Sequence, residues 1–280
     1  MPLLSVLVLT LALGAPLILA SMGGYTSERS GVINIGLEGM MMIAACMTAV
    51  VGIPLGPVAG LAAALVSATL LSSLHWLVTQ KYSVDHVISG MGINAVAAGA
   101  ASFVFGKFAD PKHEGGVPHL SVWIYYVLAI VAPLALWLYT QRARGGLRMV
   151  AVGADPEKSR LMGLSPGRIR FVALFATGLF TGLAGALLVS DAAIYTNNIT
   201  AGRGYIALAA LVVGGWRPLP TLMVCLGLGF LGSLQLRFQG TDVLAVIPSQ
   251  AWASLPYLVT IIALAGFLGK NRTPAGLGKP

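Results

Sequence analysis

Polar side chains that could bind a small solute stand inside otherwise apolar stretches of this sequence. Asn34 and Glu38 are surrounded by Val, Ile, Leu and Met, and Asn94 and Tyr205 stand in two further apolar stretches. A carboxylate within a membrane is costly to bury and is therefore a functional candidate. Amide, carboxylate and phenol groups at this depth could hydrogen-bond a polar molecule. For Asn94 and Tyr205, hydrogen bonding between helices or anchoring at the membrane interface explains the residue types equally well.

The segment around Asn34 and Glu38 also interrupts the helical pattern. It contains five glycines, at positions 23, 24, 31, 36 and 39, and glycine weakens helices. We expect a broken segment with both side chains facing a cavity; a tight loop at the membrane surface is the alternative. Ser27 could cap a helix, and we expect structural roles at the cytoplasmic edge for Glu28 and Arg29.

The composition excludes a soluble protein. Hydrophobic residues make up 57% of the 280 residues, charged residues make up 9%, and the mean hydropathy is +0.85. A soluble domain carries about 25% charged residues because its surface faces water. This chain has too few polar side chains for such a surface, so we predict an all-α, polytopic transmembrane helical bundle.

Apolar runs predict about eight spans, since a helix needs about 20 residues to cross the hydrocarbon of a bilayer. The candidates are 2–20, 36–53, 55–79, 86–107, 121–140, 169–190, 204–233 and 251–269. The first run lacks the basic start and the cleavage site of a signal peptide, so we expect a retained helix. We treat 1–280 as one transmembrane domain.

The net charge of +8 is concentrated in one loop. Of the 17 Lys and Arg residues, seven fall within 142–170. A short basic loop between spans is cytoplasmic by the positive-inside rule. The charge therefore needs no nucleic-acid partner, and we expect none. With this loop inside, 121–140 runs inward and 169–190 runs outward.

The stretch 204–233 is too long for one comfortable span and carries two glycines and two prolines between positions 214 and 220. A single crossing would leave the basic residues after position 269 outside, against the positive-inside rule. We predict a half-helix that enters from outside at 204–213 and a separate helix at 219–233, a re-entrant or broken arrangement. Helix breaks persist within a membrane only where protein or a water-filled cavity surrounds them.

Small residues recur within 169–190. Gly178 and Gly182 are four residues apart, and Gly185 follows. Such spacing lets helix backbones approach closely in a membrane. The pattern predicts tight packing within the bundle and indicates no particular partner.

The loop between the fifth and sixth spans carries the signals of a short helix. Asp155 can cap its start, Pro156 suits its first position and Glu157 its first turn. Gly163 can adopt the left-handed conformation that ends a helix. These signals predict a two-turn helix over about 156–162.

This short helix would present an apolar tip with a basic rim. Leu161 and Met162 form the tip, and Lys158 and Arg160 form the rim. One interpretation is an ordinary capped turn between two spans. The other is a plug that fits a groove on a cytoplasmic protein.

Several classes of site lack their residues. The sequence has no phosphate loop of the G-x-x-x-x-G-K-[ST] type, so the chain should not hydrolyse ATP. His113, Glu114 and His119 stand in a Gly/Pro-rich loop that fixes no geometry, so we expect no metal site. Cys46 and Cys225 stand in apolar spans and should be small buried side chains. We expect no enzyme activity.

Four segments, in order, resemble the permease subunits of ATP-binding cassette (ABC) importers for sugars, nucleosides and branched-chain amino acids. They are "SERSGVINIGLEGMMMIAA", "VDHVISGMGINAVAAGAASF", "AVGADPEKSRLMGLSPGRIRFVALFATGLFTGLAGALL" and "GRGYIALAALVVGGWRPLP". The first and last look most similar to the simple-sugar and nucleoside branch. The resemblance covers most of the chain.

The resemblance implies a role for the short helix and a set of partners. Residues 151–163, within a cytoplasmic coupling loop of about 141–168, would be the coupling helix that docks on an ABC ATPase. ATP and Mg would bind to that ATPase and no cofactor to this chain. A second permease chain, often a longer paralogue, and an external solute-binding lipoprotein would complete a transporter in a bacterial-type plasma (inner) membrane.

The resulting expectation is a permease subunit of an ATP-driven importer for a small polar solute, with nucleosides as the expected solute. Sugars or other small solutes are the alternative within this class. An ion-coupled secondary transporter is a separate alternative. It would need carboxylates within the membrane for coupling, and of the carboxylates near spans, Glu38, Asp85 and Asp191, the last two look interfacial. The translocation-path candidates Asn34, Glu38, Asn94 and Tyr205 rest on their polarity at membrane depth, because the resemblance assigns no solute contacts.

Overall fold

The computed structural model describes residues 3–109, 116–238, 258, 261 and 273–279, and this part of the chain is helical without strands. Seven helices are long and apolar enough to cross a membrane. They are α1 (Leu3–Arg29), α2 (Leu37–Leu55), α3 (Pro57–Trp76), α4 (His86–Phe108), α5 (Val122–Arg142), α8 (Pro166–Ala192) and α10 (Pro218–Phe238). The shorter elements are η1 (Leu77–Lys81), α6 (Arg144–Ala154), α7 (Pro156–Leu161) and α9 (Arg203–Val213). The predicted all-α bundle is confirmed; the predicted span 251–269 lies almost wholly outside the described residues.

The first helix is longer than predicted. It continues to Arg29, whereas the sequence indicated an end near residue 20. Gly23 does not break it, because that glycine serves packing: a Cβ there would lie 3.1 Å from the carbonyl oxygen of Thr177 on α8. The capping role expected for Ser27 is wrong, since its hydroxyl donates to the carbonyl of Gly24 within the helix.

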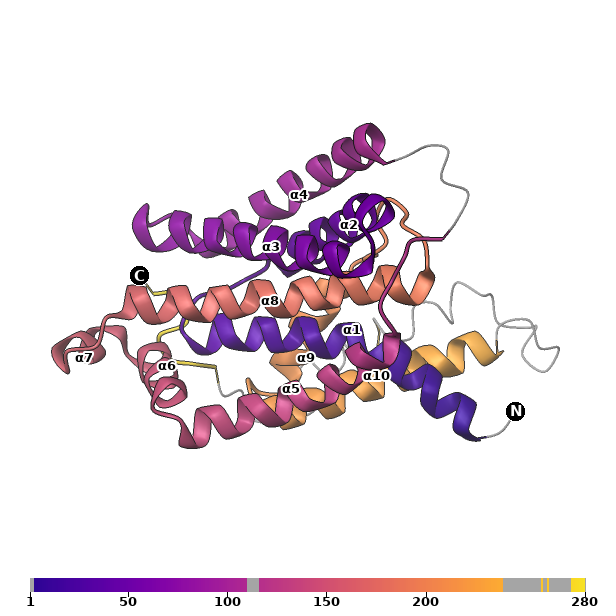
Figure 1. The fold of residues 1–280 in the computed structure, drawn as a ribbon. Helices are drawn as coiled ribbons and strands as arrows, with labels where there is room; N and C mark the ends of the chain where they lie inside the picture. Colours follow the sequence, from indigo (N-terminus) through magenta and orange to yellow (C-terminus); the bar gives the residue numbers. More distant parts are fainter. Residues whose placement is uncertain (1–2, 110–115, 239–257, 259–260, 262–272, 280) are drawn as a thin grey trace.

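The two ends of the bundle can be assigned from the basic loop. Figure 1 shows α6 and α7 together at one end and the N-terminus at the other. Arg29 of α1, Gln141 of α5 and Arg217 before α10 line one cavity at the α6–α7 end. The positive-inside rule predicts that the basic loop is cytoplasmic, and on that assignment α1 runs from the outside to the inside.

The break predicted after residue 213 is present. Residues 193–202 contain no helix, and the 11-residue α9 follows; at about 1.5 Å per residue it spans roughly half of the hydrocarbon. Residues 193–202 start at the outer end, where Ala193 accepts a hydrogen bond from the backbone of Val117. The turn after α9 reaches the inner-end cavity with Trp216. This segment therefore crosses as an irregular stretch plus a half-helix, and α10 runs outward again.

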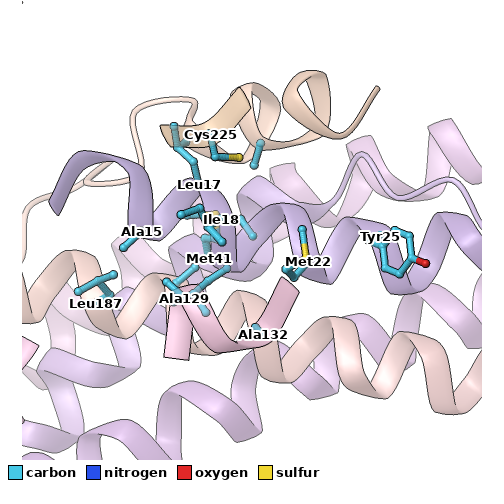
Figure 2. Packing of buried hydrophobic residues seen from close by; sticks show 14 of the residues in the cluster. Ala15, Leu17, Ile18, Met22, Tyr25, Met41, Ala129, Ala132, Leu187 and Cys225 are labelled. Atoms are coloured by element: carbon cyan, nitrogen blue, oxygen red, sulfur yellow. The ribbon is translucent and has the colours of Figure 1, made fainter. Parts of the chain in front are cut away.

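The core is formed where α1 and α8 meet their neighbours. Figure 2 shows Leu17, Ile18 and Met22 of α1 packed among side chains of α2, α5, α8 and α10. These three side chains are 0–6% exposed. Residues 14–28 of α1 are buried throughout, so this part of the helix is surrounded by the other elements.

The glycines of α8 provide the close packing expected from their spacing. A side chain on Gly178 would overlap the backbone of Thr69 on α3, and one on Gly182 would lie 3.0 Å from the Cα of Leu65. The prediction of tight packing within the bundle is confirmed.

We predict that Gly178→Val destabilises the protein by about 1–3 kcal/mol, the usual range for overpacking a dense core. The measurement is thermal unfolding of the purified protein in detergent. Gly99→Val is the matched control, since a Cβ at Gly99 of α4 meets no atom within 4 Å. Equal unfolding temperatures for the two variants would contradict the packing argument.

Candidate functional site

The short helix α7 forms as its local signals predict. The Asp155 carboxylate accepts a hydrogen bond of 3.0 Å from the Lys158 backbone N–H, and Pro156 occupies the first helical position. This bond, together with the Lys158 ammonium 3.1 Å away, lowers the pKa of Asp155 below its ordinary value. Gly163 has a φ of +79° and ends the helix in the left-handed conformation.

Two large apolar side chains stand in water at the tip of α7. Leu161 is 88% exposed and Met162 is 79% exposed. Lys158 and Arg160 are exposed beside them. Figure 1 places α7 at the extreme end of the bundle, beyond the ends of the long helices. Contact with another protein surface would remove this apolar tip from water.

The helix α6 beneath this tip was missed in the sequence. Its buried positions include Gly146, Met149 and Gly153, which are spaced as one face of a helix. That spacing is the signal for this helix in the sequence, where it stands among several arginines. The α6 helix joins α5 to α7 and supports the exposed tip.

Two of the four polar candidates within the bundle, Asn94 and Tyr205, are bonded to each other. The amide oxygen of Asn94 accepts a hydrogen bond of 2.8 Å from the Gly39 backbone N–H. Its amide nitrogen donates to the Ile35 carbonyl at 3.0 Å and to the Tyr205 hydroxyl at 2.9 Å. Asn94 therefore connects α4 to the start of α2 and to α9, which confirms the helix–helix interpretation for this pair.

Glu38 fixes the start of α9. Its two carboxylate oxygens accept hydrogen bonds from the backbone N–H groups of Gly202, at 2.8 Å, and of Gly204, at 2.6 Å. Glu38 is only 4% exposed. A carboxylate at a helix N-terminus satisfies free N–H groups and complements the helix dipole. Gly204 permits this approach, since a Cβ there would lie 2.6 Å from the Cα of Glu38.

Asn34 is used within its own loop. It is fully buried, and its side-chain oxygen accepts a hydrogen bond of 3.1 Å from the Gly36 backbone N–H. By contrast, Tyr205 is 48% exposed. A contact between solute and any of these four side chains stays a prediction.

Glu28 fixes the other end of α9. It is 3% exposed, and its carboxylate accepts a hydrogen bond of 2.5 Å from the indole N–H of Trp216. Trp216 belongs to the turn that ends α9, where its backbone N–H bonds to the Leu211 carbonyl. The structural role expected for Glu28 is confirmed.

A polar cavity of about 410 Å³ lies at the cytoplasmic end. It is bounded by α1, α5, α6 and the α9–α10 turn, and its lining is rich in aromatic and hydrogen-bonding side chains: Tyr25, Arg29, Trp137, Thr140, Gln141, Trp216 and Arg217. Pockets of this size suit small ligands. This cavity was not predicted, and its one signal in the sequence is the group Trp137, Thr140 and Gln141 at the end of a span.

The other candidate groups give no further site. The described part of the chain holds no group of three or more His, Cys, Asp and Glu suited to a metal. His113 and Glu114 lie outside the described residues. Cys46 and Cys225 are buried, as predicted.

We predict that Glu38→Gln lowers the stability of the fold. An amide has a single acceptor oxygen, so one of the two backbone N–H groups loses its partner; a hydrogen bond to a charged group contributes about 1.5–3 kcal/mol. Thermal unfolding in detergent measures the effect, with the exposed Glu157→Gln as the matched control. A Glu38→Gln protein as stable as its parent would contradict this role.

This chain is similar to known transport proteins along most of its length. Residues 6–265 match the family model "Branched-chain amino acid transport system / permease component". The chain is 34% identical to the guanosine ABC transporter permease protein NupQ of Bacillus subtilis, over 97% of this chain and 94% of that protein. It is 30% identical to the nucleoside ABC transporter permease protein NupC of Lactococcus lactis, over 94% and 92%. It is 32% identical to a putative glucose ABC transporter permease protein, TsgC13, of Haloferax volcanii, over 89% and 87%.

An ABC permease works in a membrane with an ATPase and a solute-binding protein, and it carries no enzyme activity of its own. This sets aside the ion-coupled transporter. The chain therefore belongs to the branched-chain amino acid transport system / permease component family, as a multi-pass transport subunit of the plasma (inner) membrane.

Proposed function

We propose that this chain is the permease through which an ABC importer takes up nucleosides. The observation that carries the proposal is the similarity to a guanosine and a nucleoside permease, at 34% and 30% identity over more than nine-tenths of each chain. Similarity along the full length includes the helices that bound the inner cavity. We therefore assign a nucleoside as the solute.

The driving force comes from a separate subunit in this proposal. The exposed tip of Leu161 and Met162 docks in a groove of the ABC ATPase, with the basic side chains of Lys158 and Arg160 at the edge of the contact. Burial of two such apolar side chains favours association. ATP and Mg are bound by that ATPase, because this chain has no phosphate loop.

The inner cavity suits the chemistry of a nucleoside. Trp137, which is 41% exposed, offers a flat face on which a base can stack, and the exposed amide of Gln141 offers hydrogen bonds for hydroxyl and ring nitrogen groups. In the proposed cycle, ATP-driven movement of α7 opens the bundle alternately to each side. The solute leaves through this cavity.

The remaining partners complete the transporter. A second permease chain, a paralogue, covers part of the apolar surface, and an external lipoprotein delivers the solute. The exposed apolar residues of α4 and α5 supply surface for the bilayer and for that chain; they include Met91, Val96, Phe103, Val127 and Val131.

Sugar uptake is the second candidate. It is favoured by the 32% identity to a putative glucose permease over 89% of this chain. A hexose would use the same hydrogen-bonding groups but would make less use of the aromatic faces.

We predict that Leu161→Asp combined with Met162→Asp abolishes co-purification of the ATPase. The change places two charges in an apolar contact, while membrane insertion stays intact because α7 lies outside the spans. Pull-down from solubilised membranes measures the effect. The matched control exchanges the pair as Leu161→Met with Met162→Leu, which keeps the apolar surface. Unchanged co-purification of the Asp variant would refute the docking role.

We also predict that vesicles holding the complete transporter accumulate labelled guanosine when supplied with ATP and the binding protein. Excess unlabelled nucleoside should reduce this uptake, whereas excess glucose or ribose should leave it unchanged. Competition by glucose alone would favour the sugar candidate. Uptake without ATPase subunits would refute the proposal.

A further inference from the structure

Residues 273–279 lie at the junction between the docking helix and the membrane bundle. The backbone N–H of Gly276 donates to the Gly153 carbonyl at the end of α6, at 2.9 Å. Two residues later, the N–H of Gly278 donates to the Gly31 carbonyl, also at 2.9 Å. This segment therefore joins the α6–α7 corner to the break between α1 and α2, two regions that are far apart in sequence.

The contact is made between backbones, with no side chain between them. A Cβ on Gly276 would lie 2.8 Å from the Gly153 oxygen and 3.0 Å from Cδ of Pro156, the first residue of α7. Gly31 has a φ of +101°, and a Cβ there would lie 3.2 Å from the Gly276 oxygen. Such close packing transmits displacement, because dense interiors have low compressibility.

The segment is itself held in a fixed shape. The Leu277 N–H bonds to the Pro274 carbonyl at 3.0 Å, and the Lys279 N–H bonds to the Gly276 carbonyl at 3.2 Å. Leu277 is partly buried and packs against the main core cluster. The segment is therefore a folded part of the cytoplasmic end.

The break that receives this contact is bonded to several helices of the bundle. Arg170 at the start of α8 donates to the Ser30 carbonyl at 3.2 Å, and His75 of α3 bonds to the Ile33 carbonyl at 2.9 Å. The break ends at Gly36, two residues before Glu38, which holds α9. A displacement of residues 30–36 therefore reaches α3, α8 and α9.

We propose that residues 273–279 form a strut that couples the ATPase-docking helix to the α1–α2 break. When α7 moves with the ATPase, the strut carries that motion through Gly276 and Gly278 to Gly31, and from there to the segment that positions α9. The inference rests on the proposed docking of α7. In this proposal the segment helps to position α9 and contacts neither solute nor nucleotide.

The test is Gly276→Val in the complete transporter, reconstituted in vesicles. A valine disturbs the contact with Gly153 and Pro156 while leaving Leu161 and Met162 unchanged. We expect normal ATPase co-purification and continued ATP hydrolysis, with the number of ATP molecules consumed per nucleoside imported increased by about tenfold or more, a coupling loss of ordinary size. The matched control is Ala275→Val at the neighbouring exposed position, which should keep the parent's ratio.

A deletion of residues 273–279 removes the strut without adding a side chain that could clash with its neighbours. Uncoupled ATP hydrolysis in this deletion supports the strut. Parental uptake per ATP in either variant overturns it, and so does loss of ATPase co-purification in the deletion, since the segment would then belong to the docking surface. If the unmodified chain fails to bind the ATPase, the proposed function fails instead, before either variant is compared.

Discussion

The position of α9 depends on two buried carboxylates that hold its two ends. Glu38 accepts both N–H groups offered at the start of α9, and Glu28 accepts the indole N–H of the turn that ends it. A half-helix of 11 residues cannot be placed by lipid in the way a full span can. These hydrogen bonds position α9 instead. They join its two ends to residues on either side of the break between α1 and α2.

The same requirement explains why so many polar groups stand at membrane depth. Backbone N–H and C=O groups freed by a helix break must find partners within the protein. Asn34 supplies one for Gly36, and Asn94 supplies partners for Gly39 and Ile35. Polarity in these spans therefore serves the architecture first. The side chains that remain accessible include the half-exposed ring of Tyr205 and Trp137 in the lining of the inner cavity.

Local signals could be read from the sequence, whereas contacts between residues far apart in the chain could not. The α7 helix was predicted to within a residue, because its cap, its proline and its terminal glycine act over a few positions. The broken segment after residue 213 followed from glycine, proline and charge balance. By contrast, the partners of Glu38 lie 164 and 166 residues away, and the partner of Glu28 lies 188 residues away. Only the folded chain brings those groups together, so the sequence shows that Glu28 and Glu38 are polar but not which groups they bond.

The break at residues 30–36 is where these long-range contacts converge. The break follows Glu28 and precedes Glu38. The residues that bond the two ends of α9 therefore flank the same short loop. That loop is bonded in turn to α3 and α8 and to the segment beside α7. Because packed interfaces switch between discrete arrangements rather than deform continuously, a shift of this loop should move α9 as a unit. The half-helix is thus held at both ends by residues that flank one short loop, so its position depends on that loop.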